Sequence, residues 1–304
     1  MTDLSTRVGS LLFAAPVLTA SGTSGHGAEL SNYFDLSELG AIVVKSLRVE
    51  PWSGNPAPRV HSTGASTINS VGLQGPGIEW WLTNDLPALV DTGARVVASI
   101  WGSSVEDYRL AAEALSQAPP EVVAVEVNVS CPNLEDRRRM FAHSASATAE
   151  VIAATEAVNR PRWAKLSPNV ADIAEIATAA AAAGAEAVVL VNTLLAMAID
   201  IETRRPILGA KRGGMSGAAL HPVAVRAVYD VHEAAPELPI VGVGGASTGA
   251  DVVEFLLAGA SAVEIGTATF ANPRAPHRIL GELQQWCRDH DVQCIEDLIG
   301  EAHG

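Results

Sequence analysis

The chain contains few cysteines, and they are arranged for neither disulfide bonds nor metal binding. Only three occur among the 304 residues, at Cys131, Cys287 and Cys294, and none belongs to a C-x-x-C pair. Small disulfide scaffolds have an even number of cysteines, and structural zinc sites have closely spaced ones. We therefore expect no disulfide scaffold and no metal site. We predict a cytoplasmic protein, because thiols stay reduced in that compartment.

Basic residues and long hydrophobic runs are scarce as well. The 20 Lys and Arg residues are outnumbered by 34 Asp and Glu residues, so the formal net charge is −14. Nucleic acids and anionic membranes bind basic surfaces, and we expect neither as a partner. Residues 8–20 are apolar, but Gly9 and Pro16 interrupt them and the run is too short to span a bilayer. We interpret this run as the first elements of the fold.

Eight short apolar runs recur along the chain, and each is followed by a segment of helical periodicity. The runs are 16–20, 41–44, 96–100, 122–129, 163–166, 187–191, 240–243 and 262–265. The helices are expected near 27–37, 78–91, 105–117, 146–158, 171–183, 222–234, 248–258 and 274–289. This alternation predicts an α/β protein with a parallel (β/α)8 TIM barrel, in a single domain over residues 1–304. The connections 46–77 and 194–221 are longer than a barrel needs, which indicates functional loops at the C-terminal rim.

Chemistry in such a barrel takes place at the carboxyl ends of the strands, so the residues after each apolar run matter most. They are polar or glycine throughout: Ser21 and Gly22, Lys45 and Ser46, Ser99, Asn128 and Cys131, Lys165, Asn192 and Thr193, Gly244 and Gly245, and Gly266 and Thr267. Each alone could be a turn former, and Cys131 alone could be a small buried residue. Their convergence on one rim favours a shared binding site.

Glycine-rich turns after the last two strands indicate what is bound. The segments V-G-V-G-G at 241–245 and I-G-T at 265–267 place backbone amides around one spot, where barrels of this kind bind phosphate. Glycine suits this role because no Cβ separates its backbone from the ligand. The cluster G-G-M-S-G at 213–217 could add another anion contact.

Two lysines at strand ends, Lys45 and Lys165, need an anion or an electron-rich ring if they point into the barrel mouth. A flavin supplies both, because the edge around its N1 and C2 atoms gains negative charge on reduction. The same lysines could instead form a Schiff base, as in aldolase-like barrels. Residue spacing does not separate these two classes of enzyme. A non-catalytic scaffold barrel would leave the glycine turns and Lys45 unexplained.

Long motifs extend over about residues 12–284. They are A-S-G (20–22), K-S (45–46), G-N-P-A-P-R (54–59), N-S-V-G-L-Q-G-P-G (69–77), N-V-S-C-P-N (128–133), K-L-S-P-N (165–169), V-N-T-L-L-A-M-A-I-D (191–200), R-G-G-M-S-G (212–217), V-G-V-G-G (241–245) and I-G-T-A (265–268). With these motifs the chain resembles the dihydroorotate dehydrogenases of class 1, and most of all the 1B branch. Cysteine at position 131 is typical of class 1, whereas the membrane-associated class 2 enzymes have serine there.

The resemblance implies FMN-dependent oxidation of dihydroorotate to orotate in pyrimidine biosynthesis. Cys131 would be the base that removes the C5 proton while the C6 hydride passes to flavin N5. The implied FMN contacts are Ser21, Lys45, Ser46, Ser99, Asn128, Lys165, Val191, Gly217, Gly244, Gly245, Gly266 and Thr267. The implied substrate contacts are Lys45, Asn69, Ser70, Val71, Gly72, Leu73, Asn128, Asn192 and Thr193. A carboxylate on a ring of amides suits a lysine and several asparagines.

The resemblance also implies partners. A chain of the 1B branch is expected to form a homodimer and to work with an electron-transfer subunit that carries FAD and a 2Fe-2S cluster and passes electrons to NAD. Three scattered cysteines cannot hold that cluster within this chain. The physiological acceptor, whether NAD, fumarate or quinone, stays open.

Two departures from the family pattern leave the substrate open. Ser99 stands where the family usually has an asparagine in contact with the flavin, so that contact is either bridged by water or lost. Residues 134–143, L-E-D-R-R-R-M-F-A-H, replace a glycine-rich segment that should cover the site as a lid. The arginines at 137–139 either change lid motion, substrate choice or partner docking, or form a solvated basic patch. An FMN-dependent dehydrogenase of another dihydropyrimidine is therefore the alternative.

Overall fold

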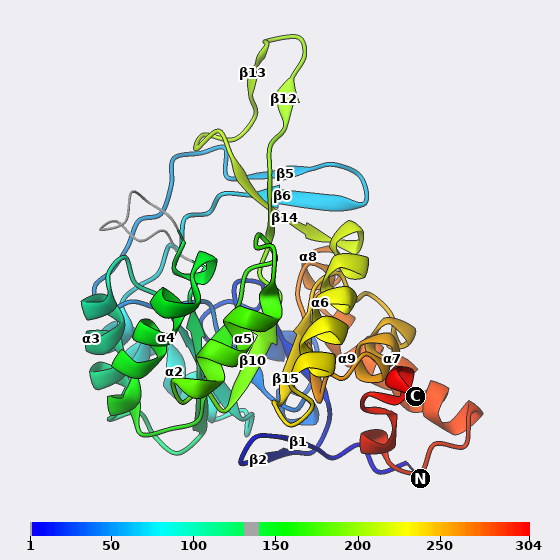
Figure 1. Ribbon diagram of the computed structural model, residues 1–304. Coiled ribbons are helices and arrows are strands. Elements are labelled where there is room, and N and C mark those ends of the chain that lie inside the picture. The colour runs from blue at the N-terminus through cyan, green and yellow to red at the C-terminus, as the bar shows by residue number, and fades with distance from the viewer. Residues whose placement is uncertain (1, 131–139) are drawn as a thin grey trace.

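Eight parallel strands form a barrel in the computed structural model, which describes residues 2–130 and 140–304 (Figure 1). They are β3 (Val17–Thr19), β4 (Ile42–Val43), β7 (Val96–Ile100), β8 (Val122–Asn128), β9 (Arg162–Lys165), β10 (Ala187–Leu190), β15 (Ile240–Val243) and β16 (Ala262–Ile265). Their order is β3-β16-β15-β10-β9-β8-β7-β4, and a bridge between Leu18 and Ala41 closes the circle. The predicted TIM barrel and all eight of its strands are confirmed, whereas the single domain stays a prediction.

Alternation along the strands sorts side chains between the two faces of the barrel wall. In β7, Val96, Ala98 and Ile100 belong to the large core between strands and helices, whereas Val97 belongs to a separate apolar cluster inside the barrel. The same interior cluster includes Ala124, Trp163 and Ala262 of the neighbouring strands. Because side chains alternate with a period of two, the residue two positions further along each strand also points inward. Those residues are Ser99, Glu126, Lys165 and Glu264, so a polar layer lies above an apolar one.

Helices cover the outside of the barrel. They are α1 (Ile78–Trp80), α2 (Leu86–Val90), α3 (Val105–Leu115), α4 (Ala145–Ala154), α5 (Ile173–Ala182), α6 (His221–Ala234), α7 (Gly249–Leu257), α8 (Ala268–Ala271) and α9 (Ala275–Asp289). The side chains that cap α3 and α7 are Ser104 and Thr248, and each accepts a hydrogen bond from a backbone N–H of the first turn. Seven of the eight predicted helical segments thus contain an α-helix.

The first predicted helix, at 27–37, is wrong. Two separate 3-10 turns, Glu29–Asn32 and Leu36–Glu38, replace it. The Asp35 side chain accepts a hydrogen bond from the backbone of Ser37 at 2.9 Å, and the Glu29 carboxylate accepts one from the backbone of Gly27 at 2.8 Å. Such local side-chain bonds compete with helix formation. The predicted helix at 78–91 is also interrupted, because residues 81–85 form a π-helical turn between α1 and α2.

The two long connections pair with each other above the barrel. Strands β5 (Val60–Ser62) and β6 (Ser66–Asn69) come from the first connection, and β11 (Leu194–Ala196) and β14 (Gly213–Gly217) come from the second. They form an antiparallel sheet in the order β11-β14-β6-β5. Between β11 and β14, the hairpin of β12 (Ile199–Asp200) and β13 (Arg205–Pro206) extends away from the barrel (Figure 1). Both loops lie on the side of the carboxyl ends of the strands, as expected.

The opposite end of the barrel is closed by the N-terminal segment. Strands β1 (Thr6–Val8) and β2 (Leu11–Phe13) form a hairpin there, and Val8 and Phe13 join the interior apolar cluster (Figure 1). The apolar run 8–20 therefore belongs to the fold, as interpreted from the sequence. Among the described residues, no helix is long and apolar enough to cross a membrane.

Candidate functional site

The polar layer inside the barrel is centred on Lys165 at the end of β9. Its ammonium group donates to Glu126 of β8 at 2.9 Å, to Glu264 of β16 at 2.8 Å and to the hydroxyl of Ser21 at 3.1 Å. Burial on its own would lower the pKa of Lys165, but the two carboxyl groups outweigh it and raise that pKa well above its ordinary value. Lys165 is therefore a fixed cation at the base of the barrel mouth, and not the neutral amine that Schiff-base formation needs.

A row of hydrogen bonds leads from this cation across the rim. The Ser99 hydroxyl donates to Glu126 at 2.7 Å and lies 2.8 Å from the Ser46 hydroxyl. Asn128 donates to Ser46 at 3.4 Å and accepts from Asn192 at 3.1 Å. Predicted cofactor residues are thus connected directly to a predicted substrate residue. Ser99 itself is fully buried within this row, so its contact with a cofactor stays a prediction.

Three glycines and Thr267 lie together on the other side of the mouth. A Cβ on Gly245 would lie 2.7 Å from the backbone oxygen of Gly217, and both glycines have positive φ. The hydroxyl of Thr267 donates to Ser216, next to Gly217, at 2.8 Å. The glycine at 266 is not required by packing, because a Cβ there would make only ordinary contacts of 3.4 Å and more. Because Gly266 has no Cβ, its backbone is accessible to a ligand.

Lys45 lies at the mouth, and no carboxylate in the described part of the chain balances its charge. Its Nζ atom is 3.8 Å from the position that a Cβ on Gly22 would take. Burial lowers the pKa of Lys45, and no carboxylate of the described residues offsets that effect. A half-buried lysine in this state favours an anionic ligand, because the ligand would restore the lost solvation.

The predicted substrate segment 69–73 begins at the last residue of β6 and continues into the loop that follows it. Gly72 and Leu73 both have positive φ, and Asn55 lies where a Cβ on Gly72 would be. The buried hydroxyl groups of Ser70 and Ser130 have no hydrogen-bond partner among the described residues. Buried polar atoms are normally satisfied, so these two hydroxyls are available to a ligand.

Sequence reasoning missed the role of Asn169, which belongs to the K-L-S-P-N motif. Its side chain donates to the backbone oxygen of Thr193 at 3.1 Å and accepts from the backbone of Leu195 at 2.9 Å. Asn169 therefore holds the segment that carries Asn192 and Thr193. The motif K-L-S-P-N marked Asn169 as part of the family pattern, but it did not predict which residues Asn169 contacts.

Comparison with known proteins identifies the family. The model of the family described as dihydroorotate dehydrogenase matches residues 3–286. The chain belongs to the dihydroorotate dehydrogenase family. It is accordingly an oxidoreductase of pyrimidine biosynthesis whose family membership implies FMN as cofactor.

Individual relatives are similar over nearly the whole chain. Dihydroorotate dehydrogenase B (NAD(+)), catalytic subunit, from Desulforudis audaxviator (strain MP104C) is 47% identical over 97% of this chain and 96% of its own. The protein of the same name from Alkaliphilus oremlandii (strain OhILAs) is 43% identical over 98% of both chains. The one from Geobacter sp. (strain M21) is 42% identical over 98% of this chain and 97% of its own. The sequence resemblance to the 1B branch is confirmed.

The residues of this dihydroorotate dehydrogenase fit FMN. The glycine turns leave backbone free for a phosphate. Within residues 2–130 and 140–304, Lys45 has no counter-anion and the hydroxyls of Ser70 and Ser130 have no hydrogen-bond partner. Lys165 fits with one condition. All three of its N–H donors are used within the protein, so a direct bond to a flavin requires that one of them be shared. Ser21 is the only one of these three partners that is not fully buried.

The predicted catalytic base, Cys131, and residues 134–139 of the predicted lid lie outside the described residues. The chain is described on both sides of them. The backbone N–H of Ser130 donates to the Asn128 side chain at 3.2 Å, and that of Ala142 donates to the Val129 oxygen at 2.9 Å. Phe141 packs edge-on against Tyr108, whose hydroxyl donates to the Asn128 oxygen at 2.7 Å.

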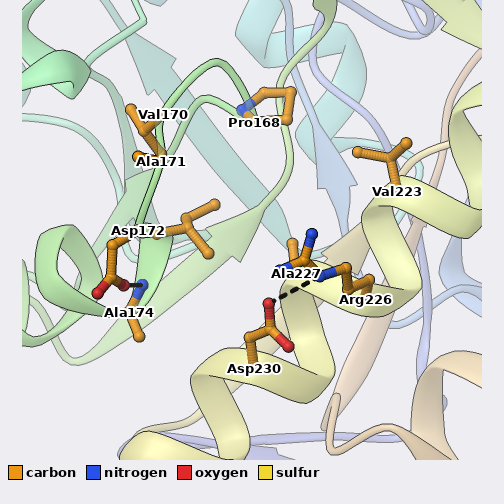
Figure 2. Close-up of a pocket in the computed structure, with 10 residues that line it drawn as sticks. Pro168, Val170, Ala171, Asp172, Ala174, Val223, Arg226, Ala227 and Asp230 are labelled. Carbon is orange, nitrogen blue, oxygen red and sulfur yellow. Dashed lines mark hydrogen bonds and ion pairs between the residues drawn. The ribbon is translucent and has the colours of Figure 1, made fainter.

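A surface hollow between α6 and the segment before α5 is distinct from this site (Figure 2). Pro168, Val170 and Val223 line it together with an ion pair of 3.1 Å between Arg226 and Asp230. None of the predicted cofactor or substrate residues belongs to its lining. The hollow is therefore not part of the candidate site, although Pro168 follows Lys165 closely in the sequence.

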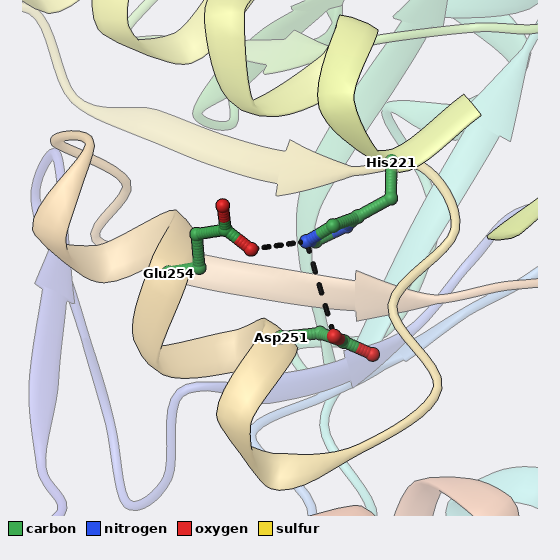
Figure 3. A group of neighbouring side chains, drawn as sticks. All are labelled: His221, Asp251 and Glu254. Atoms are coloured by element: carbon green, nitrogen blue, oxygen red, sulfur yellow. Dashed lines mark hydrogen bonds and ion pairs between the residues drawn. The ribbon is translucent and has the colours of Figure 1, made fainter. Parts of the chain in front are cut away.

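His221, Asp251 and Glu254 lie behind the glycine turn, in an arrangement that could hold a metal ion (Figure 3). One ring nitrogen of His221 lies 3.1 Å from the backbone oxygen of Gly244, and the other lies 2.9 Å from Glu254. Asp251 uses its second oxygen to cap α7. Each ring nitrogen of His221 thus has a protein partner, Gly244 for one and Glu254 for the other, so these contacts need no metal and we assign the group to support of the turn.

Proposed function

We propose that this dihydroorotate dehydrogenase oxidises dihydroorotate to orotate at the C-terminal mouth of the barrel, with FMN between Lys165 and the glycine turns. The observation that carries the proposal is the row of hydrogen bonds from Lys165 through Ser99 and Ser46 to Asn192. It joins the residues expected to hold the cofactor to those expected to hold the substrate. Both ligands would therefore be oriented by one rigid set of side chains.

The cofactor residues fall into two groups with different roles. Lys165 and Lys45 supply positive charge, and the backbone around Gly217, Gly244, Gly245 and Gly266 supplies N–H donors suited to a phosphate. The full proposed set is Ser21, Lys45, Ser46, Ser99, Asn128, Lys165, Val191, Gly217, Gly244, Gly245, Gly266 and Thr267. When bound, FMN supplies a hydride acceptor.

The substrate residues suit a small planar carboxylate with amide groups. Lys45 is the cation for the carboxylate, and Asn69, Asn128 and Asn192 offer amide donors and acceptors. Ser70, Val71, Gly72, Leu73 and Thr193 complete the proposed set. Asn128 is already held by Asn192, Ser46 and the Ser130 backbone, so its orientation is set before a ligand binds.

Cys131 is the proposed base, on the strength of its place in the motif N-V-S-C-P-N. A proton on C5 of dihydroorotate is only weakly acidic, so its removal needs a base held next to it. In the proposed step the Cys131 thiolate takes the C5 proton and becomes a thiol, while the C6–H bond gives up a hydride. The thiolate is the reactive form, because a thiol is a poor base.

Anaerobic mixing with dihydroorotate tests the proposal. Purified protein should be yellow, and dihydroorotate should bleach the flavin absorbance rapidly in a stopped-flow instrument. Bleaching by dihydrouracil but not by dihydroorotate would instead favour the second candidate, a dehydrogenase of another dihydropyrimidine. The serine at position 99 keeps that candidate open. Colourless protein that stays colourless with added FMN would contradict both candidates.

A partner subunit is proposed from the relatives, which are named as catalytic subunits of an NAD(+) enzyme. We propose that this subunit carries FAD and a 2Fe-2S cluster and passes electrons to NAD. A homodimer and a cytoplasmic location stay predictions. The apolar side chains of Leu195, Ile199 and Ile201 are 61%, 57% and 81% exposed at the sheet and hairpin above the barrel, which leaves a surface for an association. Activity with NAD, with and without co-purified protein, tests the partner.

A further inference from the structure

Two fully buried carboxyl groups share one ammonium group inside the barrel. Lys165 contacts Glu126 at 2.9 Å and Glu264 at 2.8 Å, and the side chains of both glutamates are 0% exposed. If both were ionised, the three side chains would carry one unpaired negative charge, and no other cation among the described residues contacts them. An unpaired buried charge is strongly unfavourable. One of the two carboxyl groups is therefore expected to keep its proton.

Hydrogen bonding distinguishes the two glutamates. Glu126 has both oxygens paired, because Oε1 accepts from Ser99 and Oε2 accepts from Lys165. Oε1 of Glu264 is buried and accepts no hydrogen bond from an N–H or hydroxyl donor of the described residues. Hydrogen bonds to both oxygens stabilise a carboxylate, whereas an oxygen left without donors disfavours it. Burial raises the pKa of Glu264 well above its ordinary value, and the charge of Glu126 acts in the same direction.

The direct contact between the two glutamates leads to the same assignment. Burial also opposes ionisation of Glu126, but the charge of Lys165 and the hydrogen bonds to Glu126 together outweigh burial and lower the pKa of Glu126. The side chains of Glu126 and Glu264 are within hydrogen-bonding reach of each other. Two carboxyl groups can share a hydrogen bond only when one of them carries a proton to donate.

We propose that Glu264 stays protonated at neutral pH and donates to Glu126, so that Lys165 and Glu126 balance each other beside the flavin. Glu264 is then a positioning residue, which acts through Lys165 and Glu126 and not on the substrate. A second buried anion would oppose the negative charge that a flavin gains on reduction. The proton on Glu264 thus keeps the midpoint potential of the flavin more positive than an ionised Glu264 would. This inference rests on the proposed FMN site.

Infrared spectroscopy of the purified full-length protein, with FMN bound where the protein binds it, tests the proton itself. The difference spectrum between wild type and Glu264→Gln should contain the C=O stretching band of a neutral carboxylic acid, and this band should shift in heavy water. A wild-type spectrum without that contribution, or an equal band in Glu264→Gln, overturns the proposal. This measurement does not depend on the flavin. It therefore still decides the state of Glu264 if the protein binds no FMN and the proposed cofactor site fails.

Flavin potentiometry tests the consequence. Glu264→Gln replaces one neutral group by another, so the midpoint potential should stay at the wild-type value. The double variant Glu126→Gln, Glu264→Gln removes the last anion beside Lys165 and should shift the potential to a more positive value, which shows that the measurement responds to charge here. A positive shift in Glu264→Gln alone would mean that Glu264 is ionised, and the proposal would be wrong. If the double variant does not fold, the single variant and the infrared band still decide.

Discussion

Ser99 and Glu126 face each other across β7 and β8, and the serine hydroxyl donates to Glu126 Oε1 at 2.7 Å. The pair links the buried cation Lys165 to the polar residues of the rim. Both side chains are fully buried, so neither can exchange its partner for bulk water. Ser99 was expected to contact FMN directly. In the structure it instead holds Glu126, the partner of Lys165.

Ser99→Ala should reduce stability because it leaves a buried carboxylate oxygen without a donor. The expected decrease in the free energy of unfolding is about 1 to 3 kcal/mol, measured by urea denaturation. The control is Ser62→Ala, which removes an exposed hydroxyl on β5 and should leave stability within about 0.5 kcal/mol of wild type. Equal stabilities for the two variants would show that the bond to Glu126 contributes nothing.

Gly245→Ala should weaken FMN binding. The residue has a φ of 76°, and a Cβ would lie 2.7 Å from the Gly217 oxygen, so the turn must shift. Loss of one or two well-placed hydrogen bonds to a phosphate would raise the dissociation constant about tenfold or more. Gly281→Ala is the control, because nothing lies within 4 Å of its Cβ position in α9. Fluorescence titration of flavin-free protein with FMN measures both, and unchanged affinity in Gly245→Ala would exclude this turn from the site.

Glu264→Gln should change how stability depends on pH. The pKa of Glu264 is raised in the folded protein above its ordinary value of 4.5. Above about pH 4.5 the unfolded chain therefore releases a proton that the folded protein keeps, and this group lowers the free energy of unfolding by about 1.4 kcal/mol per pH unit until its folded pKa is reached. Glutamine removes this contribution. The stability of Glu264→Gln relative to wild type should thus rise as the pH increases from about 5 to 8.

The control for that experiment is Glu202→Gln, which removes an exposed carboxylate between β12 and β13. Urea denaturation at a series of pH values provides the free energies for all three proteins. A difference between Glu264→Gln and wild type that stays constant across the pH series would contradict the assignment of a raised pKa to Glu264.

Cys131→Ala should slow flavin reduction by dihydroorotate about 10² to 10⁴-fold, because the C5 proton loses its base. FMN binding and the flavin spectrum should be retained, since the cysteine is not among the proposed cofactor residues. Stopped-flow bleaching under anaerobic conditions measures the rate, with Cys294→Ala as the control for loss of a thiol. Reduction at the wild-type rate in Cys131→Ala would assign the base to another residue.

The strand ends were predictable because they follow from alternation of hydrophobic runs and glycine turns. Lys45, Lys165, Asn128 and the turn at Gly244 all stand at the mouth of the barrel where the sequence predicted them. The 3-10 turns near Glu29 were not predictable from helical periodicity, because hydrogen bonds of single side chains decided them.

The partners of each polar side chain were also beyond reach of the sequence. Ser99 was expected to contact the flavin, yet its nearest partners are Glu126 and Ser46. Glu126 and Glu264 were read as positions within apolar strands, and neither was expected to contact Lys165. They are 138 residues apart in sequence, and only closure of the barrel places both against the same nitrogen.

The sequence by itself determined the barrel, the family and the rim to which the chemistry belongs. Periodicity and motifs can be recognised within short segments, without knowing which residues are in contact in the folded protein. The tertiary structure decided the electrostatics. Charge states depend on burial and on which groups meet, and here two carboxyl groups from different strands meet one buried lysine. This contact keeps Lys165 positively charged and, as we propose, keeps Glu264 protonated.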